Sequence, residues 1–132
     1  MADKLTILLL EDEPLILMDL EFAAEDQGYT VHSTTTCEAA LDLLADCGDA
    51  IDVAVLDVSL GQGHTCFPVA QELDRRKIPY VLHSGDLDRH NERIRQLHAQ
   101  LIAKPAAAEY VISTAVVASA GPGSPGAGLS AD

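Results

Sequence analysis

Basic residues are scarce in this chain. Eight lysines and arginines stand against 21 aspartates and glutamates, which gives a formal net charge of −13 with the five histidines neutral. Such a charge repels phosphate backbones and anionic lipids, and no Lys/Arg stripe offsets it locally. The sequence therefore argues against binding to nucleic acid or to a membrane, and it favours divalent cations or basic proteins as partners.

Cysteines and long apolar segments are also few. The three cysteines are an odd number without C-x-x-C spacing, which argues against a disulfide framework and against a zinc site. The apolar run Leu5–Leu10 lacks the basic flank and cleavage site of a signal peptide, and the prolines and glycines within the uncharged residues 110–131 make a poor membrane span. We expect a soluble, cytoplasmic protein with reduced thiols.

The 132 residues suffice for one hydrophobic core and leave no room for a second domain. Apolar runs of strand length alternate with longer segments of helical period, a pattern typical of β-α units and a parallel sheet. We predict one domain over residues 1–120 and a flexible Gly/Pro/Ser/Ala-rich tail over 121–132. The predicted strands are 6–10, 30–33, 51–56, 80–83 and 101–103, and the predicted helices are 14–28, 38–45, one from residue 68, 86–98 and 106–120.

Residues with chemically functional side chains follow four of these five strands directly. In an open α/β sheet, ligands bind outside the carboxyl ends of the strands. We therefore expect these side chains to meet at one edge of the sheet. They are Glu11, Asp12 and Glu13 after the first predicted strand, Asp57 after the third, Ser84 after the fourth and Lys104 after the fifth.

Clustered carboxylates need a compensating cation, because two of them about 4 Å apart repel by roughly 1 kcal/mol in water and about 4 kcal/mol at an effective dielectric near 20. Mg²⁺ is the natural candidate, since it takes oxygen ligands from one or two carboxylates and from phosphates. The absence of His and Cys after these strands argues against zinc. The first loop also lacks the glycines and the lysine of a Rossmann or P-loop nucleotide site.

An aspartate beside a bound metal can attack phosphorus and form an acyl phosphate, while a cation and a hydroxyl stabilise the charge of the transferring oxygens. Asp57, Lys104 and Ser84 match these three roles. Glu13 is better interpreted as a helix-start residue than as a metal ligand.

Four motifs, in this order and spacing, resemble those of the receiver domains of two-component response regulators. They are LLLEDEP at residues 8–14, VAVLD at 53–57, VLHSG at 81–85 and IAKP at 102–105, and the resemblance covers the chain from about Leu5 to Ala120. It implies a flavodoxin-like α/β fold, that is, a doubly wound five-stranded parallel sheet of order 2-1-3-4-5 flanked by five helices.

The resemblance also implies a role for each site residue. Asp57 matches the phosphoacceptor, which takes a phosphoryl group from the phosphohistidine of a sensor histidine kinase or phosphotransfer protein. Glu11 and Asp12 match the acidic pair that binds Mg²⁺ together with the Asp57 side chain and the main-chain carbonyl of Ser59.

Ser84 matches the switch hydroxyl that closes on the phosphoryl group, and Lys104 matches the lysine that pairs with it. The side chains of Ser59 and Asp86 occupy positions that influence the rate of acyl-phosphate hydrolysis. By this resemblance the protein is no enzyme toward other molecules, catalyses only its own phosphorylation and dephosphorylation, and signals by contact with a target protein that the sequence does not name.

Three departures from the family pattern indicate a divergent single-domain receiver. Leu101 stands where many receivers carry the aromatic ring that moves on activation, which puts a ring-based switch in doubt. Gly61 follows Leu60 in place of the usual proline and predicts a looser loop beside Asp57. The segment before the last strand ends in His98-Ala99 instead of Gly-Ala.

The predicted last helix has apolar residues on more than one face, whereas covering one side of a sheet needs a single stripe. We expect a partner surface there or self-association of the protein, unless the tail covers the helix. The histidines His83, His90 and His98 lack ligand spacing, and we expect surface or partly buried structural roles for them.

Two other functions compete with the receiver hypothesis. Aspartyl-phosphate phosphatases carry a second Asp two residues after the nucleophile, and Ser59 occupies that position here, which argues against a hydrolase. The second alternative is a degenerate receiver that acts as a phosphorylation-independent docking module. The complete set of site residues argues against it, whereas Leu101 keeps it open.

Overall fold

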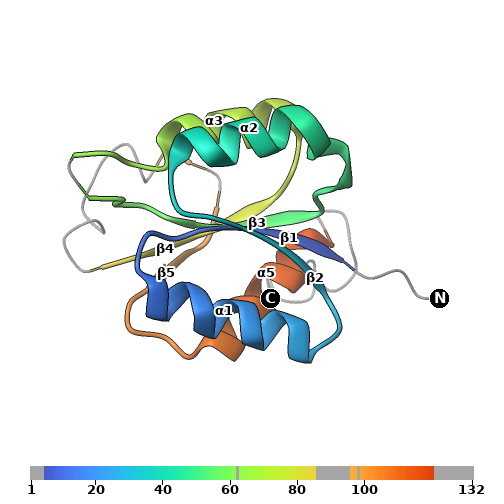
Figure 1. Cartoon of the computed structure of the whole chain (residues 1–132), viewed down its shortest axis with the longest axis vertical. Coiled ribbons are helices and arrows are strands. Elements are labelled where there is room, and N and C mark those ends of the chain that lie inside the picture. Colours follow the sequence, from blue (N-terminus) through green and yellow to red (C-terminus); the bar gives the residue numbers. More distant parts are fainter. Residues whose placement is uncertain (1–4, 62, 86–95, 98, 121–132) are drawn as a thin grey trace.

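The computed structural model describes residues 5–61, 63–85, 96–97 and 99–120. Five parallel strands form one sheet in the order β2-β1-β3-β4-β5. Helices α1 and α5 cover one face of this sheet and α2 and α3 cover the other (Figure 1). The strands are β1 (Thr6–Leu10), β2 (Thr30–Thr34), β3 (Val53–Asp57), β4 (Tyr80–Ser84) and β5 (Leu101–Ala103), and the helices are α1 (Pro14–Asp26), α2 (Cys37–Cys47), α3 (Phe67–Arg76) and α5 (Ala108–Ser119), with a 3₁₀ turn η1 (Gly48–Ala50).

This topology confirms the predicted fold class. The described residues contain four of the five predicted α-helices. The predicted helix over 86–98 falls mostly on residues outside the described ranges, as do His90, His98, Asp86 and the whole predicted tail, so those predictions stay untested.

The two faces of the sheet pack into separate cores, because successive side chains of a strand point to opposite faces. In β1, Leu8 and Leu10 pack with residues of α2 and α3, whereas Ile7 and Leu9 pack with residues of α1 and α5. All five residues of β3 are buried. This explains why residues 53–56 are apolar without interruption, as is typical of a parallel sheet covered on both faces.

Local signals place most element ends within one or two residues of their predicted positions. Pro14 opens α1, as predicted, and Gly28 follows its end with a φ of +89°. Helix α2 begins at Cys37 because the side chain of Thr36 caps it, with Thr36 Oγ1 accepting from the Ala39 N–H at 3.1 Å. Strand β3 begins two residues later than predicted, because Ile51 closes the η1 turn instead.

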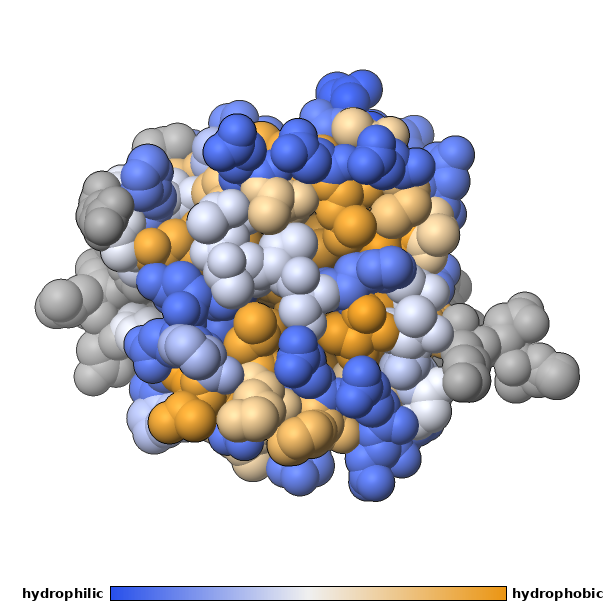
Figure 2. Space-filling model, viewed as in Figure 1, coloured by the Kyte–Doolittle hydropathy of each residue, from blue (hydrophilic) through white to orange (hydrophobic). Residues whose placement is uncertain are grey.

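Helices α1 and α5 also expose large apolar side chains, and Figure 2 shows one face of the molecule on which hydrophobic and hydrophilic residues are interspersed. The exposed residues are Leu15, Met18 and Phe22 on α1 and Tyr110 and Val117 on α5. Among the residues described here, no helix has both the length and the apolarity that a bilayer-spanning segment requires.

Candidate functional site

The carboxyl edge of the sheet brings together the residues that the sequence analysis selected. Asp57 and Ser84 are the last residues of β3 and β4, while Glu11 and Lys104 directly follow β1 and β5. Strands β1 and β3 are paired with Leu10 opposite Leu56, so the next residue of each strand places Glu11 beside Asp57. Parallel pairing thus converts four distant sequence positions into one site.

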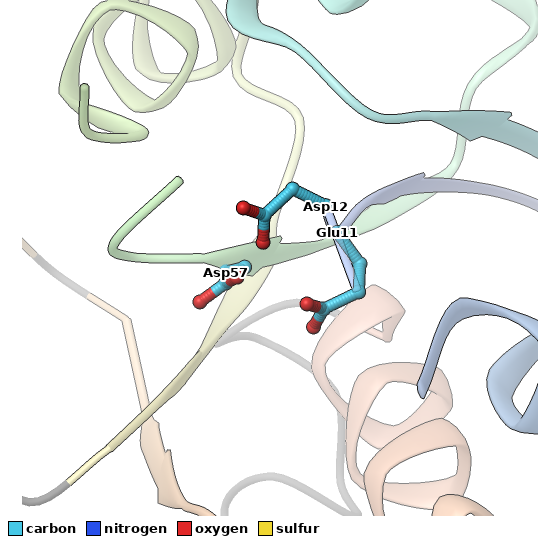
Figure 3. A group of neighbouring side chains, drawn as sticks. All are labelled: Glu11, Asp12 and Asp57. Carbon is cyan, nitrogen blue, oxygen red and sulfur yellow. The ribbon is translucent and has the colours of Figure 1, made fainter. Parts of the chain in front are cut away.

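Three carboxylates form the centre of this site. Glu11, Asp12 and Asp57 each offer an oxygen, and these three oxygens lie within 4.8 Å of one another. Figure 3 shows Glu11 and Asp12 reaching from the end of β1 toward Asp57 at the end of β3. Glu11 and Asp57 are only 1% and 3% exposed, whereas Asp12 is half-buried. The cluster is therefore open to solvent on the Asp12 side.

Lys104 is the cation of the cluster. Its Nζ lies 3.3 Å from Glu11 Oε1 and 3.3 Å from Asp57 Oδ1, and it donates to Glu11 Oε2 at 3.4 Å. Burial alone would lower the pKa of Lys104, but the carboxylates of Asp57 and Glu11 outweigh burial and raise it. Lys104 is therefore charged, and its single positive charge is shared by two carboxylates.

The Asp57 carboxyl group has a strongly raised pKa in this site. Burial and the neighbouring Glu11 carboxylate raise the pKa of Asp57 to about 8, although Lys104 acts in the opposite direction. The cluster thus holds more acidic groups than Lys104 alone can neutralise. A second cation at the three carboxylates would favour the ionised form of Asp57.

The two serines of the predicted site differ in their surroundings. Ser84 is fully buried, and its hydroxyl donates to the main-chain carbonyl of Gly85 at 3.4 Å, a weak contact that leaves the hydroxyl available for a better acceptor. Ser59 is exposed on the segment after β3, where it pairs with Thr65 in an isolated bridge. The metal-binding role of the Ser59 carbonyl stays a prediction.

Two backbone hydrogen bonds connect residues of the loop beside Asp57, and the looser loop expected from Gly61 stays a prediction. The N–H of His64 donates to the Gly61 carbonyl at 2.9 Å, and the N–H of Leu60 donates to the His64 carbonyl at 2.9 Å. Gly61 has a φ of +79°, and a Cβ at this position would lie 3.3 Å from Asp12 Oδ2. Glycine is therefore suited to this position for two reasons, its backbone conformation and its closeness to an acidic residue of the site.

Glu13 is placed as the sequence analysis predicted. It is exposed and forms the N-cap of α1. Its contribution to the site comes from the backbone, since its N–H donates to Glu11 Oε2 at 3.2 Å.

His83 is more deeply buried than the surface or partly buried position that the sequence analysis expected. It is 3% exposed, and its Nδ1 lies 4.0 Å from Glu11 Oε1. Burial and the nearby charge of Lys104 lower the pKa of His83 to about 4, so the ring is neutral near pH 7. The sequence contained one indication of this position, because His83 directly precedes Ser84 at the end of an otherwise apolar strand.

Comparisons with known proteins agree with this geometry. No model of a known protein family matches the sequence. A segment of 58 residues, 44% of this chain, is 34% identical to part of the sensor kinase CckA of Brucella abortus (strain 2308), and the match spans 6% of that much longer protein.

Solved structures match nearly the whole chain. The solution structure of SdrG from Sphingomonas melonis Fr1 is 36% identical and has a TM-score of 0.73, with 90% of this chain and 98% of SdrG covered. A response regulator receiver protein from Sinorhizobium medicae WSM419 is 26% identical, with a TM-score of 0.75 and coverage of 90% and 97%. A receiver domain from Clostridium thermocellum, 21% identical with a TM-score of 0.74, has the same fold. The chain belongs to the family of response regulator receiver domains of two-component signal transduction.

Proposed function

We propose that this protein is a phosphorylation-controlled signalling switch. It accepts a phosphoryl group on Asp57 from the phosphohistidine of a sensor histidine kinase or phosphotransfer protein, in a reaction that depends on Mg²⁺. The observation that supports this function best is the position of Asp57, which is buried between two further carboxylates and one lysine at the carboxyl edge of the sheet. We also propose that residues 1–120 make up the receiver domain, that the Gly/Pro/Ser/Ala-rich residues 121–132 lie outside it, and that the protein acts in the cytoplasm without binding nucleic acid or membranes.

The donor set of the site suits Mg²⁺. Three carboxylates within 4.8 Å of one another are hard oxygen ligands, and burial together with the neighbouring Glu11 carboxylate raises the pKa of Asp57. We propose that Glu11, Asp12 and Asp57 hold the ion together with the main-chain carbonyl of Ser59. When bound, Mg²⁺ would neutralise negative charge on the carboxylates and on the phosphoryl oxygens.

In the transfer step, an oxygen of the Asp57 carboxylate attacks phosphorus. The bond from phosphorus to the donor's imidazole nitrogen breaks, and its electron pair stays on that nitrogen. Lys104 Nζ, already 3.3 Å from Asp57 Oδ1, stabilises the charge of the phosphoryl oxygens. The Ser84 hydroxyl, held only weakly by Gly85, turns to donate to one of these oxygens and so couples phosphorylation to the end of β4.

Signal output then proceeds by contact with a protein target. We propose that the exposed part of α5, around Tyr110 and Val117, is the surface for self-association or for this target. Both side chains are large and apolar, and they lie on a helix whose opposite face already covers the sheet with Val111, Ile112 and Ala115.

Intact-mass spectrometry after incubation with acetyl phosphate tests the chemistry. We expect the wild type to gain one phosphoryl group with Mg²⁺ and none with a chelator. The variant Asp57→Asn should gain none, whereas the matched control Asp46→Asn, at an exposed aspartate of α2, should behave as the wild type. Phosphorylation of Asp57→Asn would contradict the assignment of the acceptor.

The competing function is a docking module that binds its partner without phosphorylation. Leu101 favours this alternative, because its half-buried side chain packs against the core on the α2 and α3 face and supplies no aromatic ring for a switch. If this alternative holds, Asp57→Asn will bind the partner as tightly as the phosphorylated wild type does. If the switch operates, only the phosphorylated wild type will bind tightly.

A further inference from the structure

His83 is a buried polar residue in β4, a strand whose preceding residues pack in the core. The other β4 residues before Ser84 are Tyr80, Val81 and Leu82, all buried. Within the described ranges, neither ring nitrogen of His83 has a hydrogen-bond partner. An unsatisfied buried polar group costs about 1–3 kcal/mol, so an apolar residue would fit this position better if packing were its sole requirement.

Next to this ring lies a carboxylate oxygen that forms an ion pair with Lys104 but has no hydrogen bond to the described residues. Glu11 Oε1 is the other buried side-chain atom of the described residues that has no hydrogen bond, and it lies 4.0 Å from His83 Nδ1. The second oxygen, Glu11 Oε2, accepts from the backbone N–H of Glu13 at 3.2 Å. Half of the Glu11 carboxylate is thus fixed by the backbone, while the other half faces an imidazole nitrogen just beyond hydrogen-bond distance.

Lys104 cannot be the permanent partner of that oxygen. Its Nζ lies 3.3 Å from Glu11 Oε1 and equally close to Asp57 Oδ1, on the carboxylate that is to accept the phosphoryl group. When Lys104 turns to the phosphoryl oxygens, Glu11 Oε1 loses its nearest cation. The Nδ1 atom of His83, 4.0 Å from Glu11 Oε1, is then in a position to take over as donor.

We propose that His83 is a positioning residue for Glu11, with a ring N–H that donates to Glu11 Oε1 and orients the carboxylate for Mg²⁺. This inference rests on the proposed function, because it assumes that Glu11 is a metal ligand. A neutral imidazole has one N–H and one acceptor nitrogen, so the tautomer protonated on Nδ1 is sufficient. Ligating carboxylates are commonly held in this way by an outer hydrogen-bond donor.

The structure leaves room for the required movement. The present distance of 4.0 Å must shorten to about 3 Å to make a hydrogen bond. A cavity of about 250 Å³ borders both His83 and Lys104, and Ile16, Leu20 and Pro105 form part of its apolar wall. The side chains of His83 and Lys104 are therefore not packed tightly on every side.

The test measures the Mg²⁺ dissociation constant of the full chain by isothermal titration calorimetry, for the wild type, His83→Leu and His83→Asn. Leu keeps most of the volume and has no donor, whereas the amide nitrogen of Asn takes the place of Nδ1. We expect His83→Leu to raise the dissociation constant about 10- to 100-fold. His83→Asn should recover most of the wild-type affinity.

A melting curve without metal separates this role from a structural one. His83→Leu removes an unsatisfied buried group, so its metal-free form should melt at or above the wild-type temperature. Unchanged affinity in His83→Leu would overturn the inference, and so would equal weakening in the Leu and Asn variants. Should His83→Leu melt markedly lower, His83→Met provides a more flexible apolar replacement for the same comparison.

Asp12→Asn distinguishes failure of this inference from failure of the metal site. If Asp12→Asn binds Mg²⁺ as well as the wild type does, the proposed metal site is wrong. If Asp12→Asn binds weakly while His83→Leu binds normally, the metal site holds and the role of His83 is wrong.

Discussion

Lys104 Nζ lies 3.3 Å from Asp57 Oδ1, so the residue after β5 contacts the last residue of β3 across the carboxyl edge of the sheet. Strand β4 separates these two strands within the sheet. The same Nζ lies 3.3 Å from Glu11 Oε1. A single ammonium thus links two carboxylates from two strands, and it opposes the rise in the pKa of Asp57 that burial and Glu11 cause.

Removing this ammonium should destabilise the protein in a metal-dependent way. In Lys104→Met the carboxylates repel one another without a compensating cation, so we expect the melting temperature at pH 8 in EDTA to fall. Saturating Mg²⁺ should restore most of the loss. Lys77→Met, at an exposed lysine, is the control and should show no such dependence on metal. An equal loss with and without Mg²⁺ in Lys104→Met would argue that the lysine acts through packing alone.

Two glycines of the loop after β3 permit a matched comparison. Gly61 and Gly63 both have a φ of +79°, but an added Cβ meets Asp12 Oδ2 at 3.3 Å only in the case of Gly61. Alanine at either position is strained by the backbone conformation and should cost about 1 kcal/mol or more of stability. Only Gly61→Ala should also weaken Mg²⁺ binding, because it displaces the Asp12 carboxylate. Calorimetric titration of both variants checks this difference, and equal affinities would contradict it.

The raised pKa of Asp57 predicts a pH dependence of the metal-free protein. The pKa is about 8 in the folded state against an ordinary value of 3.8, so between about pH 4 and pH 8 the folded state retains a proton that the unfolded state has lost. The contribution of Asp57 to the free energy of unfolding is therefore at its full value below pH 4, and it decreases as the pH rises toward 8. The buried His83 acts in the opposite direction below pH 6.5, because its pKa is lowered to about 4.

Asp57→Asn isolates the contribution of Asp57, since both proteins contain His83. Chemical denaturation in EDTA should show that the wild type loses stability relative to Asp57→Asn as the pH is raised from 5 to 8. Mg²⁺ should reduce this loss by favouring the ionised carboxylate. A constant difference between the two proteins over this range would show that Asp57 ionises with its ordinary pKa.

The exposed apolar part of α5 predicts concentration-dependent self-association. Val117 is 55% exposed, and the charge introduced by Val117→Asp should keep the protein monomeric in sedimentation equilibrium experiments. Phe22→Asp changes a similarly exposed apolar residue on α1 and serves as the control. Monomeric wild-type protein at every concentration would leave α5 as a surface for a different partner.

The pattern of residues along the chain was enough to predict the sheet, the order of its elements along the chain and the residues that gather at its edge. Apolar runs separated by helical periods specify β-α units, and parallel strands in such units place all their carboxyl ends on one side. For this reason Glu11, Asp57, Ser84 and Lys104 could be assigned to one site from their positions directly before or after strand ends, without any knowledge of distances.

How these groups share their charges became known from the packing of the folded chain. Sequence periodicity shows which face of a strand is apolar, but it does not show which side chains from distant segments come into contact. The shared position of Lys104, the burial of His83 beside Glu11 and the approach of Gly61 to Asp12 all depend on packing between separate elements. The pKa of Asp57 follows from the same packing, because burial and neighbouring charges are properties of the folded chain.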